Sequence, residues 1–168
     1  MHLKSITAGG HITKISEKYI VYLKAVKNVR MIIVHYRKEK KQIMKAIHWA
    51  VLGTGVIANE MASALQKNGK RLYAVGNRTY EKAVAFAKKY GVEKVYNDYN
   101  EMFTDPEVDV IYITTPHNTH INFMKKAIEN GKHVLVEKSI TLNSSELQEA
   151  VALAEQKGVV IGEAMTIF

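Results

Sequence analysis

The sequence contains no cysteine and only two prolines in its 168 residues. Without cysteine the chain can form neither a disulfide nor a thiolate metal site, which suits a reducing compartment, and we expect a cytoplasmic location. The sequence also lacks any apolar run close to the roughly 20 residues that a membrane-spanning helix requires, so we expect no membrane partner. The scarcity of proline, together with short loops, favours one compact unit for residues 44–168.

Acidic residues are scarce at the start of the chain. Residues 1–43 hold ten Lys and Arg but only two Asp and Glu, whereas residues 44–168 hold fourteen of each kind. The net charge of +8 therefore belongs to a basic leader, and the rest of the chain is neutral. The charged run 37–41 is compatible with an arm for nucleic acid or acidic lipid. The plainer interpretation, which we prefer, is a floppy, disordered extension, and nucleic acid is not an expected partner.

The leader does not resemble a signal peptide. Its apolar stretches, residues 19–23 and 31–34, are short, and no small-residue cleavage site follows either of them. Met44 stands just before the first expected strand of the compact unit. We hypothesise that Met44 is the natural start and that residues 1–43 are not native. An intact mass showing that the native protein begins at Met1 would contradict this hypothesis.

From residue 44 onward, apolar runs of strand length alternate with helical patterns. Strands are expected at residues 47–52, 71–76, 94–96, 108–113 and 133–136 and from residue 159. Helices are expected between them, ending near Asn68, Gly91, Asp105, Asn130 and Gly158. A βαβ series with right-handed crossovers predicts an α/β fold, a doubly wound parallel sheet of Rossmann type with about six strands.

Helical spacing also predicts which residues face the sheet. The expected inward residues are Ile57, Met61, Ala64 and Leu65 in the first helix, Ala83, Phe86, Ala87 and Tyr90 in the second, Ile121, Met124 and Ile128 in the fourth, and Leu147, Val151 and Ala154 in the last. Asp98 and Asn143 are expected to cap the helices that follow them, each with a Glu three residues on.

The first expected strand leads directly into a glycine turn, Gly53–Gly55, and a helix follows at once. In a dinucleotide-binding turn the first Gly permits the tight turn and the second lets the backbone approach a pyrophosphate. The small Ala58 at the third position lets helix and strand pack closely, and the amides that open the helix face the phosphates. The alternative interpretation is a purely structural turn or a degenerate site.

The second expected strand ends without an acidic residue. A site that prefers NAD usually has an acid here to accept from the ribose hydroxyls, whereas this chain has Asn77 and Arg78. Asn77 can still bond a ribose hydroxyl, and Arg78 can face a 2′-phosphate or stack on adenine, so we favour NADP over NAD. The alternative is an exposed Arg at a helix start, where the helix dipole disfavours a cation.

The fourth expected strand ends in the polar run Thr114–His120, which can line a pocket beside the cofactor. Alternatively, Asn118 or Thr119 simply caps the following helix, and the two roles are compatible. His117 and His120 are three residues apart, a spacing compatible with a metal pair. No further ligand lies nearby in the sequence, so we expect no metal site.

The fifth expected strand ends in Glu137, Lys138 and Ser139. A Lys at this position can point into the cleft, bond a substrate oxygen and take part in proton transfer. From spacing alone, a surface ion pair between Glu137 and Lys138 is the more common arrangement.

Taken as an ordered set, these residues resemble the Gfo/Idh/MocA family of oxidoreductases. The matching motifs are residues 53–58, 77–78 with 80–83, 96–99, 109–113 with 115–120, 131–138 and 163–165. The resemblance covers residues 46–168 and none of residues 1–43. The run Glu163–Met165 looks most like the branch of dihydrodiol dehydrogenase-like enzymes.

The resemblance implies an enzyme that uses NAD or NADP to oxidise or reduce hydroxyl or carbonyl groups of sugars, inositols and related polyols. It implies an active-site role for Lys138, which would orient the substrate hydroxyl and aid proton transfer. The cofactor contacts that it implies are Gly53, Gly55, Val56, Ile57, Asn77, Arg78, Thr115, Pro116, Asn118, His120 and Glu137.

The chain departs from the family pattern at two points. Ser139 stands where the family motif has proline, which puts the placement of Lys138 in doubt because proline fixes the backbone. Family enzymes also have a second, substrate-binding domain, and this chain stops at Phe168, where that domain would begin. We therefore expect the cofactor-binding half of an oxidoreductase that is not competent alone. The alternative is a non-enzymatic NAD(P) sensor, or a module that pairs with a partner chain.

Overall fold

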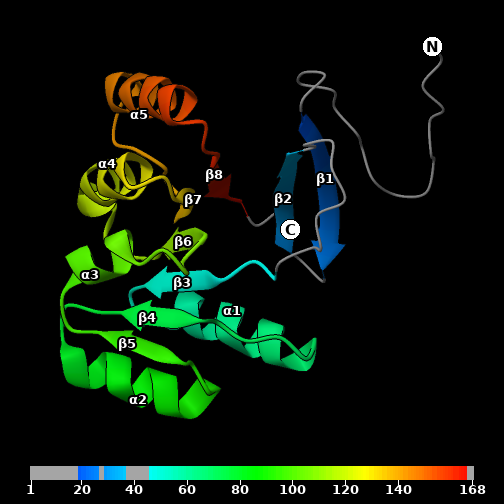
Figure 1. The fold of residues 1–168 in the computed structure, drawn as a ribbon, viewed down its shortest axis with the longest axis vertical. Coiled ribbons are helices and arrows are strands. Elements are labelled where there is room, and N and C mark those ends of the chain that lie inside the picture. Colours follow the sequence, from blue (N-terminus) through cyan, green and yellow to red (C-terminus); the bar gives the residue numbers. More distant parts are fainter. Residues whose placement is uncertain (1–18, 27–28, 37–45, 166–168) are drawn as a thin grey trace, which may run out of the picture. The chain divides into compact units, whose positions relative to one another are not determined.

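A computed structural model of the chain describes residues 46–165 in full and, for residues 19–26 and 29–36, the strands that they form (Figure 1). The chain divides into two units, Met1–Met44 with Ala164–Phe168, and Lys45–Glu163. The second unit carries every residue that we predicted for cofactor binding or catalysis.

The first unit contains an antiparallel hairpin where we expected a floppy extension. Strand β1 (Tyr19–Val26) pairs with β2 (Val29–Tyr36) over the full eight residues of each strand. Both segments are rich in β-branched and aromatic residues and lie two residues apart, a pattern typical of a hairpin. That residues 1–43 form a disordered or non-native extension stays a prediction. The charged run 37–41 and Met44 lie outside the described residues.

The second unit is built on a six-stranded parallel sheet, which confirms the predicted architecture. Its strands are β3 (Trp49–Leu52), β4 (Ala74–Gly76), β5 (Lys94–Tyr96), β6 (Val110–Ile113), β7 (His133–Glu137) and β8 (Ile161–Ala164). They lie in the order β5-β4-β3-β6-β7-β8. Within this sheet the chain enters at β3, runs outward to β5, and then returns to β6 and continues to β8 (Figure 1). The strand order therefore reverses between β3 and β6.

Helices connect the strands and cover both faces of the sheet. They are α1 (Val56–Lys67), α2 (Tyr80–Tyr90), α3 (Tyr99–Thr104), α4 (His120–Glu129) and α5 (Ser144–Lys157), with a 3₁₀ turn η1 (His117–Thr119) before α4. Because parallel crossovers are right-handed, the helices that lead toward β5 and those that lead toward β8 lie on opposite faces. In agreement, α1 packs against α2, and α4 packs against α5.

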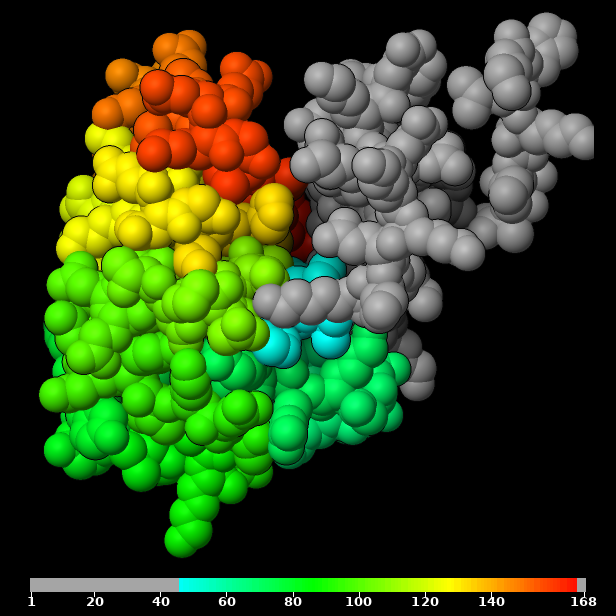
Figure 2. Space-filling view, viewed as in Figure 1, coloured from blue at the N-terminus to red at the C-terminus, as the bar shows by residue number. Residues whose placement is uncertain are grey.

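The largest core cluster lies between the sheet and the face that α3, α4 and α5 cover. Leu52, Ile111 and Ile113 from the central strands meet Phe103 of α3 and Met124 of α4, and all five are essentially fully buried. Burying a side chain of this size stabilises the fold by about 1.5–3 kcal/mol. Figure 2 shows that side chains fill the spaces that separate these elements in the ribbon view.

The predicted faces of two helices are confirmed, and those of two others need correction. Helix α2 buries its predicted residues, and α4 buries Met124 and Ile128. In α1, however, the residues buried against the sheet are Ala58, which the glycine-turn motif predicted, and Ala62. In α5 they are Ala150 and the predicted Ala154. The residues predicted to be inward but found exposed are Ile57, Ala64 and Val151. Both helices approach the sheet through small side chains, which an apolarity pattern weighted toward large residues overlooks.

Candidate functional site

The carboxyl ends of four strands bring the predicted site residues to one edge of the sheet. Leu52 pairs with Gly76 on one side and with Ile113 on the other, and Ile113 pairs with Val136. The segments that follow these strands therefore start side by side. They hold every predicted residue, namely Gly53, Gly55, Val56, Ile57, Asn77, Arg78, Thr115, Pro116, Asn118, His120, Glu137 and Lys138.

Gly53 makes the tight turn out of β3, for two separate reasons. Its φ of 106° lies in the left-handed region that favours glycine. Its amide donates to the carbonyl of Gly76, 2.8 Å away, which ties the turn to the end of β4. A Cβ at Gly53 would lie 2.6 Å from Oγ1 of Thr114, so a side chain has no room there.

Gly55 precedes α1 and has a different surrounding. Its φ is −72°, and apart from its two chain neighbours no heavy atom of the described residues lies within 4 Å of a Cβ built on it. No side chain caps α1, and its first turn holds no acidic residue. The next two side chains, Val56 and Ile57, are 73% and 38% exposed. Among the described residues, nothing beyond its chain neighbours therefore crowds Gly55 on the side from which a pyrophosphate would approach.

The end of β4 is lined by Asn77, Arg78 and a residue that the sequence did not reveal, Tyr99. The side chain of Asn77 donates to the carbonyl of Thr79 at 3.0 Å, and Arg78 is exposed. Cδ1 of Tyr99 lies 3.4 Å from a Cβ built on Gly76. Burial raises the pKa of Tyr99, and the charge of Arg78 opposes that rise.

The end of β6 forms a compact polar turn. The hydroxyls of Thr115 and Thr119 lie 2.7 Å apart, and Oγ1 of Thr119 also donates to the carbonyl of Pro116 at 2.6 Å. Thr119 occupies the cap position of α4, but its side chain makes no capping bond. The alternative role as a simple helix cap is thus not the one that its hydroxyl fills. Pro116 and Asn118 are exposed at the edge of the sheet.

His120 is fully buried and joins two strand ends. Its Nε2 lies 2.8 Å from the carbonyl oxygen of Thr115, and its Nδ1 lies 2.9 Å from that of Ser139. Both ring nitrogens are therefore occupied by backbone groups of the described chain. A metal pair of His117 and His120 does not fit this arrangement, because neither nitrogen of His120 is left to bind an ion.

At the end of β7, the side chains of Glu137 and Lys138 have different surroundings. The hydroxyl of Tyr112 donates to Glu137, while Lys138 is exposed and has no ion-pair partner among the described residues. The structure therefore does not contain the surface ion pair between Glu137 and Lys138. The peptide bond between Lys138 and Ser139 is cis.

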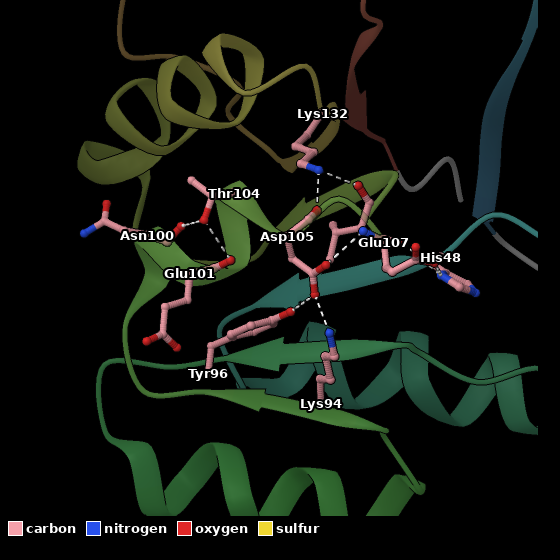
Figure 3. A network of polar contacts seen from close by, with 10 residues as sticks. His48, Lys94, Tyr96, Asn100, Glu101, Thr104, Asp105, Glu107 and Lys132 are labelled. Atoms are coloured by element: carbon pink, nitrogen blue, oxygen red, sulfur yellow. Dashed lines mark hydrogen bonds and ion pairs between the residues drawn. The ribbon is translucent and has the colours of Figure 1, made fainter.

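A second polar cluster lies at the opposite, amino-terminal edge of the sheet (Figure 3). The carboxylate of Asp105 accepts from Nζ of Lys94 at 2.8 Å and from the hydroxyl of Tyr96. The buried Lys132 donates to the carbonyls of Asp105 and Val108. Asp105 and Lys132 precede β6 and β7, so this cluster ties loops together away from the glycine turn.

The ionisation of Asp105 reflects these contacts. Burial opposes its charge, but hydrogen bonds from Lys94, Tyr96 and the amide of Glu107 outweigh burial and lower the pKa of Asp105 to about 2. In the same cluster, burial and the bond to Asp105 raise the pKa of Tyr96.

Within residues 46–165 and the two hairpin strands, no helix is long and apolar enough to cross a membrane.

Comparison with known proteins agrees with this geometry. Residues 47–165 match the oxidoreductase family with an NAD-binding Rossmann fold. The chain belongs to the Gfo/Idh/MocA oxidoreductase family. Membership accounts for the glycine turn at the point where the strand order reverses, since dinucleotides bind there in doubly wound sheets.

Curated relatives include a dihydrodiol dehydrogenase, as the resemblance suggested. Trans-1,2-dihydrobenzene-1,2-diol dehydrogenase of Mus musculus is 36% identical over 123 residues, which cover 71% of this chain and 37% of that protein. An uncharacterised oxidoreductase of Rhizobium meliloti is 33% identical over 126 residues, or 74% of this chain and 38% of that protein. The chain therefore spans well under half the length of the curated relatives that it matches.

Solved structures share the fold of the second unit. An NAD-binding oxidoreductase from Klebsiella pneumoniae has a TM-score of 0.65 and 33% identity, covering 70% of this chain and 34% of that one. A 3-ketoreductase from Actinomadura kijaniata in complex with NADP has a TM-score of 0.66 and 27% identity, covering 71% and 38%. The second unit is thus an NAD(P)-binding Rossmann domain of an oxidoreductase, and its cofactor is a nicotinamide dinucleotide.

Proposed function

We propose that this chain is the cofactor-binding part of an oxidoreductase that acts on hydroxyl or carbonyl groups of sugars, inositols or related polyols. One observation carries the proposal. The open glycine turn after β3 and the exposed Lys138 after β7 lie at the same edge of the sheet, on either side of the end of β6. A bound dinucleotide and the group that handles the substrate oxygen would therefore be neighbours.

We propose NADP as the preferred cofactor. Arg78 is exposed at the end of β4, and no acidic residue stands between Gly76 and Thr79 to accept from a 2′-hydroxyl. A planar guanidinium suits a phosphate, because it donates to two oxygens at once. The 3-ketoreductase that this chain resembles was solved in complex with NADP, and that similarity supports the preference.

Lys138 is the proposed catalytic residue. A bound nicotinamide supplies hydride acceptance or donation. The ammonium of Lys138 would hold the substrate oxygen by hydrogen bonding and take part in moving its proton. We propose that substrate contacts come mainly from a second domain, since Lys138 is exposed and hydride transfer needs substrate and cofactor held in fixed geometry. The present chain would then bind cofactor without turnover.

A titration of thermal stability with NADP and with NAD tests the proposal. A ligand that binds only the native state stabilises it by about 2.7 kcal/mol at a hundredfold excess over Kd. We expect a larger shift with NADP than with NAD, and we expect Arg78→Ala to remove that difference. Arg71→Ala, an exposed arginine before β4 at the amino-terminal edge, is the matched control. A shift with neither cofactor would contradict the proposal.

A second candidate is a non-enzymatic module that senses NAD(P) or pairs with a partner chain. The exposure of Val56, Pro116, Asn118 and Lys138 at the cofactor edge favours it, because a partner could complete the site there. Co-purification of a partner chain would support this alternative. A cytoplasmic location and the absence of nucleic-acid and membrane partners stay predictions from composition.

A further inference from the structure

The peptide group between Ser139 and Ile140, one residue after Lys138, is held at both of its polar atoms. The carbonyl oxygen of Ser139 lies 2.9 Å from Nδ1 of His120. The amide of Ile140, which belongs to the same peptide group, donates to Oε1 of Glu163 at 2.8 Å. Two side chains distant in sequence, one from α4 and one from β8, thus clamp the Ser139–Ile140 peptide plane, one residue after Lys138.

The clamp is anchored to the cofactor side of the site. His120 is fully buried, and its other nitrogen lies 2.8 Å from the carbonyl oxygen of Thr115, which follows β6. Both partners of the ring are carbonyl oxygens, which only accept hydrogen bonds. A neutral ring can donate to one of them at a time, and a protonated ring to both. In either state the ring spans the gap between the ends of β6 and β7.

We propose that His120 and Glu163 are positioning residues that fix Lys138 relative to the nicotinamide half of the cofactor site. The two nucleotide halves lie on either side of the point where the strand order reverses. Because β4 carries Arg78 on the adenosine side, the ends of β6 and β7 lie on the nicotinamide side. Neither side chain touches cofactor or substrate in this role. The inference rests on the proposed function for the part that Lys138 plays.

The first test measures the clamp without any ligand. Exchange of the Ile140 amide is followed by NMR in the full chain. In His120→Leu, we expect this amide to exchange about tenfold faster, because the loop loses its bond at Ser139. His120→Asn should restore slow exchange, since its amide can take the place of Nδ1. His120→Gln, which reaches the place of Nε2, should not. Asn122→Ala, at an exposed position of α4, is the control.

The second test separates the two halves of the ligand. Affinities for NADPH and for 2′-phospho-ADP-ribose, which lacks nicotinamide, are measured by calorimetry. Because the ends of β6 and β7 lie on the nicotinamide side, we expect His120→Leu and Glu163→Leu to lower the affinity for NADPH about tenfold. The affinity for 2′-phospho-ADP-ribose should stay unchanged within about twofold. Glu163→Gln keeps an acceptor for the Ile140 amide and should restore NADPH affinity. If the two residues had a merely structural role, their substitution would lower the affinity for both ligands equally.

The outcomes distinguish the two proposals. Three results would each overturn the positioning role. They are equal losses of affinity for NADPH and for 2′-phospho-ADP-ribose, unchanged Ile140 exchange in His120→Leu, and slow Ile140 exchange restored by His120→Gln but not by His120→Asn. If the wild-type chain bound neither ligand, the proposed function would fail, and Ile140 exchange alone would decide whether the clamp exists. The Asn and Gln variants keep polar side chains, so they remain readable if a Leu variant fails to fold.

Discussion

At the scale of single residues, the two glycines of the turn are required for different reasons. Gly53 is required by the protein itself, because its backbone is left-handed and Thr114 leaves no space for a side chain. Gly55 has an ordinary φ and open space above it. The described chain gives no reason of its own for glycine at that position, whereas an approaching pyrophosphate does. The fold therefore requires glycine at position 53, whereas the proposed ligand accounts for glycine at position 55.

Substitution by alanine should separate these two requirements. Gly53→Ala should destabilise the fold by about 1–3 kcal/mol, since it adds both strain and a clash with Thr114. Gly55→Ala should change stability by less than about 0.5 kcal/mol, yet weaken dinucleotide binding. Urea unfolding with and without NADP measures both effects. Equal loss of stability in the two variants would contradict this account.

At the scale of elements, α1 is held against the sheet by small side chains. Ala58 and Ala62 are buried, while Ile57 is 38% exposed near the glycine turn. Close approach of α1 brings its first amides to the edge where β3 ends. The apolar residues at its start are then left facing the cofactor side. The orientation of α1 about its axis therefore both buries Ala58 and Ala62 and leaves Ile57 exposed near the glycine turn.

A pair of substitutions in α1 checks this orientation. Ala58→Leu should cost about 1–3 kcal/mol, because a larger side chain is forced between helix and sheet. Ala64→Leu, at a position that we first expected to face inward, should lie within about 0.5 kcal/mol of the wild type. Chemical denaturation of the two variants gives the comparison. If Ala64→Leu were the more damaging change, the observed helix rotation would be refuted.

At the scale of the whole molecule, the two edges of the sheet have separate tasks. The carboxyl edge gathers the glycine turn and the exposed polar ends of β4, β6 and β7. At the amino edge, Asp105 and Lys132 join β5, the loop before β6 and the loop before β7 (Figure 3). The second edge therefore holds the loops together without using residues of the site.

Acid should weaken the fold through Asp105. Its pKa is lowered from the usual 3.8 to about 2, so the unfolded chain binds the proton first as the pH falls. The stabilisation is present above about pH 4 and is lost between about pH 4 and pH 2. Asp105→Asn should lose about 1–3 kcal/mol at neutral pH and show a flatter acid dependence. Urea unfolding between pH 2 and pH 7 measures both.

A surface carboxylate provides the control for this pH effect. Glu149 pairs with Lys125 on the surface, and its side chain is 57% exposed. Glu149→Gln should therefore change stability by less than about 1 kcal/mol and leave the acid dependence as in the wild type. If Glu149→Gln flattened the curve as much as Asp105→Asn, the assignment to Asp105 would be wrong.

The order of strands and helices, the glycine turn and the set of strand-end residues were all predictable from sequence. Apolar periodicity and turn residues act over a few neighbours, so a short window contains the information. The hairpin of the leader was missed, although its two segments carry β-branched residues two residues apart. The basic charges around it led us to expect disorder instead.

The sequence by itself determined the doubly wound sheet, the edge at which we propose that the dinucleotide binds and the candidate chemistry of Arg78 and Lys138. Only the tertiary structure placed Tyr99 beside Gly76, turned Ala62 toward the sheet and set His120 and Glu163 on one peptide group. These contacts join residues that are far apart along the chain. They depend on strand order, register and helix rotation together, and no local pattern encodes that combination.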